Sequence, residues 1–316
     1  MKLTLRGNVT VYVGLYHRAV VWTRLQHLPE AIRSEVTNEA ACREWASWIP
    51  PRTDAAVVMQ VVSKDYVDLQ RNFIRLIELN SAFTRQHIFL MCLDNASVSL
   101  LASWGIRRVP LATLNLHTHK DVWKTRVRVL RCLVKEGNDV ILSDSDALWL
   151  GDPMEYIDLS SSSSSSVIAS RGGYLRKIGS EWGSTMCVGF AMFRATGAAL
   201  DTFQDAIQRI VLGIGDDQIA LNQAALELGI VWNEGSDIRY GKRTGFGKGA
   251  ITGLSGDDGE SFEVTLLPHN KFTRHCAGTP ITNETVVVHC FHRKAARAKT
   301  SWMQQLDLWS PHGIRS

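Results

Sequence analysis

Residues 140–152 constrain this chain more than any other stretch. They read Val-Ile-Leu-Ser-Asp-Ser-Asp-Ala-Leu-Trp-Leu-Gly-Asp, so apolar runs stand on both sides of Asp144 and Asp146. Such runs are typical of buried strands, and burying two like charges is costly unless something compensates them. A divalent cation is the obvious compensator, because hard cations bind carboxylate oxygens. The alternative is a polar turn between two short strands, but the apolar flanks favour a metal site.

The segments around this motif alternate between strand and helix patterns. The sequence predicts strands at 9–15, 55–62, 88–93, 108–111, 140–142, 167–170, 188–193 and 286–289. It predicts helices at 29–48, 66–79, 96–104, 122–135, 198–211, 217–228 and 295–308. This alternation indicates an α/β fold with a mostly parallel sheet whose two faces are covered by helices. Open sheets of this class bind ligands at the carboxyl ends of their strands, which is where the two aspartates lie.

The chain has 316 residues, of which 45% are hydrophobic, which is ample for one large core. Ile49-Pro50-Pro51 ends the first helical pattern, so we expect residues 1–54 to form an N-terminal extension packed on a domain at 55–316. The seven serines at 160–166 predict a flexible surface loop. Residues 241–260 are rich in glycine and lack periodicity, which predicts a long loop.

The composition excludes several classes of protein. The net charge is +4 without a block of Lys or Arg, so nucleic acid is not an expected partner. No Cys-x-x-Cys pair is present, which argues against a zinc knuckle. The cysteines in apolar or amphipathic runs are expected to be buried thiols in a reducing compartment: Cys92, Cys132, Cys187 and Cys290.

Neither a membrane-spanning stretch nor a signal-peptide pattern is evident. We therefore expect a cytoplasmic protein, or a Golgi-lumen protein if the sequence is part of a longer chain.

Two aspartates leave coordination positions open, and His289 is the best candidate for a third ligand. It ends the apolar run Thr285-Val286-Val287-Val288, so it is expected at the same rim of the sheet as the aspartates. The alternative is a histidine that only caps a strand.

Other polar residues fit around such a cation. Gly215-Asp216-Asp217-Gln218 begins a helix, where an acid can simply cap the helix. Two acids and an amide exceed that need, so Gln218 is a candidate to hydrogen-bond sugar hydroxyls while Asp217 orients them. Lys124 and Lys299 could each neutralise a phosphate, although each could also be a solvated surface lysine.

Taken together, these residues resemble a known family, the nucleotide-diphospho-sugar transferases related to plant rhamnogalacturonan xylosyltransferases (glycosyltransferase family 77). The resemblance covers about residues 55–309 and rests on several short motifs in the right order. These are the 140–153 stretch, Gly189-Phe190-Ala191-Met192-Phe193-Arg194, Asp217-Gln218 with Asn222, and Val288-His289 followed by Lys299 and Leu308-Trp309.

The resemblance implies a GT-A fold that binds a sugar nucleotide through Mn²⁺ or Mg²⁺. It implies Asp144 and Asp146 at the metal and the donor ribose, His289 as the third metal ligand, Lys124 and Lys299 at phosphate or donor sugar, and Asp94 at the nucleoside. The implied reaction moves a sugar, most plausibly from a UDP-sugar, to a hydroxyl of a glycan or glycoprotein with retention of configuration. Asp217, Gln218 and Lys124 are the expected catalytic residues.

Two segments depart from the family pattern and bear on the donor sugar. Arg171-Gly172-Gly173 stands where the family often has an acidic residue, and Cys290-Phe291-His292 replaces its usual aromatic residue or Asn after the metal histidine.

Two other functions remain open. A phosphatase of the haloacid-dehalogenase type also places Asp-x-Asp after an apolar strand, although Leu148 stands where its pattern wants Thr or Val. A non-catalytic sugar-nucleotide-binding protein is the second alternative, and the complete set of Asp, His and Lys argues against it.

Overall fold

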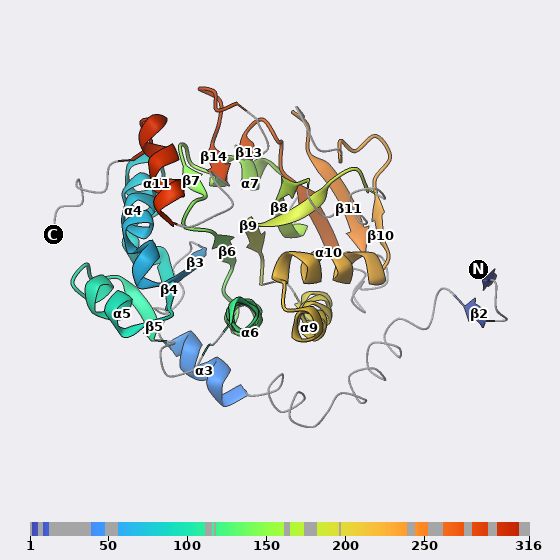
Figure 1. The fold of residues 1–316 in the computed structure, drawn as a ribbon. Helices are drawn as coiled ribbons and strands as arrows, with labels where there is room; N and C mark the ends of the chain where they lie inside the picture. Colours follow the sequence, from blue (N-terminus) through green and yellow to red (C-terminus); the bar gives the residue numbers. More distant parts are fainter. Residues whose placement is uncertain are drawn as a thin grey trace.

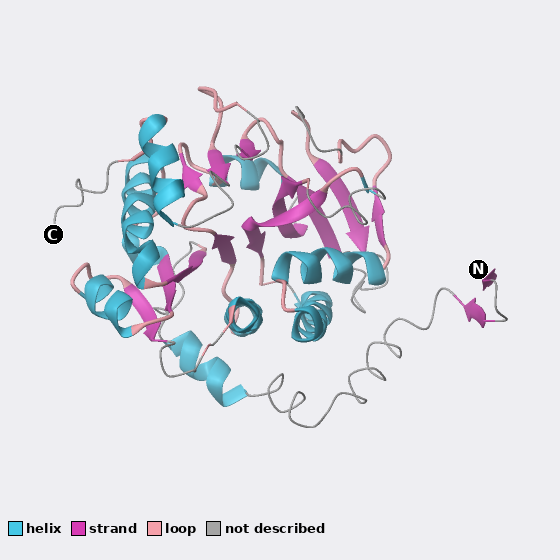
Figure 2. Cartoon of the chain, in the orientation of Figure 1, coloured by secondary structure: helices cyan, strands magenta, loops and turns pink. Residues whose placement is uncertain are grey.

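A nine-stranded mixed sheet runs through the part of the chain that the structure describes (Figures 1 and 2). This computed structural model describes residues 2–5, 9–12, 39–47, 56–110, 116, 118–160, 165–173, 182–195, 197–238, 244–251, 262–274, 280–289 and 296–309. The strand order is β10-β11-β12-β8-β9-β6-β3-β4-β5. The predicted α/β class with a large, helix-flanked sheet is therefore confirmed.

One half of the sheet is parallel and carries the aspartate motif at a strand end. Its strands are β3 (Val57–Val62), β4 (Ile88–Cys92), β5 (Arg107–Pro110) and β6 (Val140–Ser143). The connections carry the short turns η1 (Lys64–Tyr66) and η2 (Arg85–His87) and the helices α4 (Val67–Asn80), α5 (Asn95–Ala102) and α6 (His119–Lys135). Strands β3, β4 and β6 are buried almost throughout, which explains why they read as continuous apolar runs in the sequence.

The other half of the sheet is mixed. Strand β9 (Thr185–Phe193) lies antiparallel between β6 and β8 (Ser165–Gly172). Beyond β8 come β12 (Phe262–Leu266), β11 (Gly247–Ile251) and β10 (Ile230–Trp232). Helices α9 (Gly197–Ile214) and α10 (Asp217–Glu227) pack together, and both contact α6.

A separate three-stranded sheet brings the end of the chain to the aspartate motif. Its order is β13 (Phe272–Arg274), β14 (Val287–His289) and β7 (Leu148–Trp149). Val288 of β14 pairs with Leu148 of β7, only two residues after Asp146. His289 therefore lies beside the aspartates. In the pairing of β14 with β13, the residue opposite His289 is Arg274. Helices α7 (Met154–Ser160) and α11 (Ala296–Gln305) complete the fold.

Trp149 anchors the turn that carries the two aspartates. Its side chain is fully buried and meets the rings of Phe73, Phe83 and Phe190 edge to face. Its indole N–H donates to Ser143 Oγ at 3.3 Å. Aromatic pairs of this geometry add about 0.5–1.5 kcal/mol each beyond burial of their area. The turn between β6 and β7 is therefore fixed by packing on both sides.

Two predicted loops contain strand. Ser165 and Ser166 of the serine run begin β8, and Ser166 is buried, so the surface-loop prediction is wrong for these two residues. Within 241–260, the stretch Gly247–Ile251 forms β11, paired with β10 and β12. The prediction of a loop at 241–260 is therefore wrong for these five residues. Main-chain hydrogen bonds and closely packed glycines define β11, and neither leaves an apolar pattern in the sequence. At Gly249, for example, a Cβ would crowd Trp232.

The N-terminal part of the described chain comprises β1 (Lys2–Leu5), β2 (Val9–Tyr12) and α3 (Glu39–Ser47). Helix α3 packs on α6, and Cys42 and Cys132 form a disulfide between these helices. The prediction of a thiol at Cys132 is therefore wrong, because the fold brings together two cysteines that lie 90 residues apart in the sequence. Cys92 and Cys187 are buried thiols as predicted, and Cys290 lies outside the described residues.

Across the described helices, none has the length and apolar character needed to cross a membrane.

We expect reduction of the Cys42–Cys132 disulfide to destabilise the protein. A cross-link between residues 90 positions apart restricts the unfolded chain and typically contributes about 2–5 kcal/mol. Reductant should lower the Tm of the wild type and of a Cys92→Ala control, but should not affect Cys42→Ala. A wild-type Tm that ignores reductant, with Cys42 and Cys132 both alkylated in the unfolded, unreduced protein, would contradict the disulfide.

Candidate functional site

Asp144, Asp146 and His289 meet at the ends of β6 and β14. Each offers one ligand atom, and these atoms all lie within 4.8 Å of one another. His289 Nε2 is 3.3 Å from Asp144 Oδ2 and 3.9 Å from Asp146 Oδ1. A tight turn, in which the Ala147 N–H donates to the Asp144 carbonyl at 2.8 Å, aims both carboxylates to one side. The structure thus brings together the three residues that the sequence predicted as metal ligands.

In each aspartate, one carboxylate oxygen binds a positively charged side chain and the other faces His289. Asp144 Oδ1 accepts a hydrogen bond from Arg126 Nη1 at 2.8 Å, and Asp146 Oδ2 accepts one from Lys299 Nζ at 2.7 Å. The remaining oxygens, Asp144 Oδ2 and Asp146 Oδ1, face His289 Nε2. Two carboxylate oxygens and one imidazole nitrogen that converge in this way fit a divalent cation such as Mn²⁺ or Mg²⁺.

Gly189 of β9 makes room for the His289 ring. A Cβ at this position would overlap the imidazole, so any side chain here would displace it. The Gly189 carbonyl also accepts a hydrogen bond from the Asp144 N–H at 2.9 Å. One glycine therefore contacts the histidine and the first aspartate of the cluster, which explains the Gly-Phe pair that the sequence placed in this strand.

The charged groups of the cluster shift the pKa values of its members. Burial alone would lower the pKa of His289, but Cys187, Asp144 and Asp146 outweigh it and raise that pKa to about 9. Burial alone would raise the pKa of Asp144, but Arg126 and His289 hold it well below its usual range. In the metal-free protein the imidazole is therefore protonated at neutral pH and pairs with the two carboxylates.

Arg126 is a site residue that the sequence analysis missed. It is buried on α6, and its guanidinium bridges Asp144 and Asp217, with Nε 2.5 Å from Asp217 Oδ2. Burial opposes its charge, but Asp217 and Asp144 outweigh burial and keep its pKa above the usual value. The available signal was an arginine within the apolar stripe of α6, four residues from both Val122 and Leu130.

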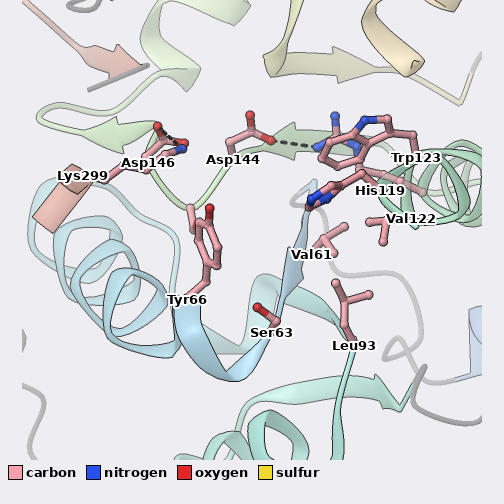
Figure 3. A pocket seen from close by; sticks show the side chains of 12 residues that line it. Val61, Ser63, Tyr66, Leu93, His119, Val122, Trp123, Asp144, Asp146 and Lys299 are labelled. Atoms are coloured by element: carbon pink, nitrogen blue, oxygen red, sulfur yellow. Dashed lines mark hydrogen bonds and ion pairs between the residues drawn. The ribbon is translucent and has the colours of Figure 1, made fainter. Parts of the chain in front are cut away.

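A pocket of about 190 Å³ opens beside the two aspartates (Figure 3). Figure 3 shows Tyr66 and Lys299 on one wall and His119 and Trp123 on the other. The rings of His119 and Trp123 are stacked, with centroids 6.3 Å apart. The remaining lining residues are Val61, Ser63, Leu93, Val122, Arg126, Asp144, Ser145 and Asp146. Apolar and aromatic walls with a few charged groups at one end are typical of small-molecule sites.

Five of the predicted site residues lie outside this lining: Asp94, Lys124, Asp217, Gln218 and His289. Asp94 caps α5, and its carboxylate accepts the main-chain N–H groups of Ser97 and Lys64, each at 2.7 Å. Lys124 does not line the pocket, whereas Arg126 does. Residues two apart on a helix point in different directions. The positively charged residue of α6 at the pocket is therefore Arg126, about half a turn after Lys124.

Asp217 and Gln218 flank the cluster from the start of α10. Asp217 reaches it through Arg126. Gln218 Nε2 lies near Gly172 of β8, where an added Cβ would be 3.2 Å from Nε2 and 2.7 Å from Thr185 Oγ1. Within the described part of the chain, the Gln218 Nε2 and Thr185 Oγ1 atoms are buried without a hydrogen-bond partner. Buried polar atoms usually have a hydrogen-bond partner, so these two are exceptions in the fold.

The two departures from the family pattern have different outcomes. Arg171 is fully buried, and its Nη2 donates to the Gly245 carbonyl at 2.6 Å, so it packs inside the fold. Cys290, Phe291 and His292 lie outside the described residues.

The sequence profile of the nucleotide-diphospho-sugar transferases matches residues 112–303, which include all three predicted metal ligands. The chain belongs to this family. It is a nucleotide-sugar glycosyltransferase, and this identification favours the predicted transferase over the phosphatase. No curated protein matches the whole sequence significantly.

Several solved glycosyltransferase structures are similar to this chain. The bifunctional glycosyltransferase WbbM is 12% identical, with a TM-score of 0.50 over 82% of this chain and 52% of its own length. The chain thus spans about half of WbbM. The galactosyltransferase LgtC, solved with donor and acceptor sugar analogues, is 10% identical, with a TM-score of 0.44 over 82% of this chain and 97% of LgtC. Mouse xyloside xylosyltransferase 1 is 10% identical, with a TM-score of 0.34 over 54% of this chain and 74% of its own. The predicted GT-A fold is confirmed by the first of these likenesses together with the sheet described above.

We expect Gly189→Ala to abolish divalent-cation binding while the fold persists. The new methyl group would overlap the His289 ring and force it away from the aspartates. The matched control is Gly151→Ala, where the added Cβ would make ordinary contacts of 3.8 Å or more with Val286. Calorimetric titration with Mn²⁺, beside a circular dichroism melt, separates the two variants. Wild-type Mn²⁺ affinity in Gly189→Ala would contradict the ligand assignment of His289.

We also expect Mn²⁺ affinity to rise with pH up to about 9. Below that value His289 is protonated in the metal-free protein, so an incoming cation must displace a proton. The apparent Kd should therefore fall about tenfold per pH unit between pH 6.5 and 8.5, with about one proton released per Mn²⁺. Titrations in buffers of different ionisation enthalpy measure this release. A pH-independent Kd would show that His289 does not bind the cation.

Proposed function

We propose that this glycosyltransferase moves a sugar from a UDP-sugar to a hydroxyl of a glycan or glycoprotein, with Mn²⁺ or Mg²⁺ and with retention of configuration. The observation that carries the proposal is the convergence of Asp144, Asp146 and His289 at the edge of a pocket. The positively charged side chains of Arg126 and Lys299 also line this pocket. Asp144, Asp146 and His289 would hold a divalent cation, which would supply positive charge against the negative charge that develops when the sugar leaves.

Arg126 and Lys299 would assist the departure of the diphosphate. Both line the pocket, and each is held by one aspartate of the cluster. Burial alone would lower the pKa of Lys299, but Asp146 outweighs burial and raises it, so the ammonium stays charged. Preorganised positive groups beside a developing phosphate charge lower the barrier without reorganisation cost. We therefore assign to Arg126 the phosphate role that the sequence suggested for Lys124.

The groups that can accept a proton support the proposed retention. Asp144 and Asp146, the carboxylates lining the described pocket, already bind cations and face the metal position. In the proposed step, the bond between the anomeric carbon and the β-phosphate oxygen breaks. The acceptor oxygen bonds to the same face of the sugar, and its proton passes to the leaving phosphate. The nucleotide itself thus serves as the base.

The remaining assignments complete the proposal. The aromatic walls formed by Tyr66 and by the His119–Trp123 pair suit a flat base, and we take it to be uracil. Asp217 and Gln218 lie on the donor-sugar side, and Asp94 acts by fixing the loop beside the nucleoside. Residues 55–316 would form the transferase domain and 1–54 an extension packed on it.

For localisation we propose the lumen of the secretory pathway, such as the Golgi, in preference to the cytoplasm. Disulfides such as Cys42–Cys132 form and persist in oxidising compartments and are rare in the cytosol of most organisms.

A donor panel tests the function. Purified protein is incubated with UDP- and GDP-sugars, including UDP-xylose, and Mn²⁺-dependent release of the nucleoside diphosphate is measured. We expect turnover with at least one UDP-sugar and none after chelation. Asp146→Asn keeps the size of the side chain but removes its charge, and should lower turnover about 100- to 1000-fold, equivalent to about 2.7–4 kcal/mol in the barrier.

The control for this variant is Asp201→Asn, which removes an exposed carboxylate of α9 outside the pocket and should act as the wild type. Metal-independent turnover, or unchanged turnover in Asp146→Asn, would overturn the metal assignment. Release of phosphate from simple phosphomonoesters instead would favour a phosphatase.

A further inference from the structure

The two ring nitrogens of His289 face different surroundings. Nε2 faces the two aspartates, whereas Nδ1 lies 3.6 Å from the sulfur of Cys187. Cys187 is fully buried on β9, two residues before Gly189, whose missing side chain admits the ring. The imidazole thus lies against one short stretch of β9, with a glycine under its face and a thiol at its outer nitrogen.

The sulfur is itself held in place. Arg274 Nη1 donates to Cys187 Sγ at 2.6 Å. Arg274 is the register partner of His289 across β13 and β14, so the small sheet that delivers the histidine also delivers the group that fixes its sulfur neighbour. Because Cys187 is fully buried, bulk water does not compete for this contact.

We propose that Cys187 is a positioning residue for the metal site: its sulfur accepts the Nδ1–H of His289 and thereby directs Nε2 toward the cation. The inference rests on the proposed role of His289 as a metal ligand. A histidine that binds a metal through one nitrogen commonly donates the other N–H to a fixed acceptor, which sets the tautomer and the ring orientation.

A sulfur acceptor suits this position because the guanidinium of Arg274 lies against it. The usual acceptors are carboxylates, main-chain carbonyls or water. At Cys187 the acceptor is a sulfur, and the adjacent Arg274 offsets negative charge on it. A cysteine sulfur accepts weakly, and the hydrogen bond from Arg274 holds it where the ring needs it. Cys187 thus provides an acceptor without a further carboxylate.

The competing explanation is that Cys187 only fills space, as buried cysteines often do. Two substitutions separate these roles. Cys187→Ala removes the acceptor, and Cys187→Ser restores one of similar size. Cys92→Ala is the matched control, because Cys92 is also buried and outside any disulfide but lies on β4, where it does not line the pocket.

The first measurement is Mn²⁺ affinity by calorimetry without nucleotide. We expect Cys187→Ala to bind Mn²⁺ about 10- to 100-fold more weakly than the wild type. Cys187→Ser should recover most of the loss, and Cys92→Ala should match the wild type. Thermal melts show whether each variant is folded.

The second measurement is the ¹⁵N NMR spectrum of labelled histidine in the metal-free and Mg²⁺-loaded protein, with His289→Gln used to assign the signal. In the wild type, the Nδ1 proton should be hydrogen-bonded in both states and Nε2 unprotonated when Mg²⁺ is bound. In Cys187→Ala the Nδ1 proton should exchange freely. A folded Cys187→Ala with wild-type Mn²⁺ affinity and an unchanged Nδ1 signal would overturn the proposal.

These outcomes also separate this inference from the proposed function. Metal-dependent turnover in the wild type together with unchanged Mn²⁺ affinity in Cys187→Ala would reject only the positioning role. Mn²⁺ binding that depends on Cys187, without turnover of any nucleotide sugar, would reject only the function.

Discussion

The structure around the site depends on how two neighbouring carboxylates are kept charged. Asp144 and Asp146 lie one residue apart in a turn fixed by packing, and their repulsion would strain the fold without partners. Arg126 and Lys299 each bind one oxygen of one aspartate, which leaves the opposite oxygens facing His289. The proposed cation site is therefore already assembled without metal, because the ion pairs that stabilise the two carboxylates also orient their remaining oxygens toward His289.

This arrangement requires distant parts of the chain to fold together. The third candidate ligand, His289, comes from β14 and reaches the aspartates because β14 pairs with β7 directly after them. Gly189 of β9 then admits the imidazole. The helices contribute in the same way, since α6 supplies Arg126 and α11 supplies Lys299. The site thus forms only when both sheets are complete, which couples the activity of the protein to its global fold.

The sequence predicted what depends on local pattern. The central strands read as apolar runs because they are buried, and Asp144, Asp146 and His289 stood out as polar residues at strand ends. Arg126 was missed because a buried arginine on an amphipathic helix looks like an ordinary polar position until its partners are known. Strand β11 was missed because its glycines give no apolar pattern, and the Cys42–Cys132 disulfide was missed because it joins segments that are distant in the sequence. Three-dimensional proximity, which a single sequence does not contain, accounts for these failures.

The charges of the site explain why a cation and a diphosphate suit it together. In the metal-free protein, the two aspartates of the motif and Asp217 face Arg126, Lys299 and the protonated His289, so the cluster is close to neutral. A divalent cation that displaces the imidazole proton adds one net positive charge at the edge of the pocket. An anionic diphosphate is then attracted more strongly to the loaded site than to the empty one. A neutral free sugar gains little from this field, so the electrostatics of the site favour the phosphate half of a nucleotide sugar.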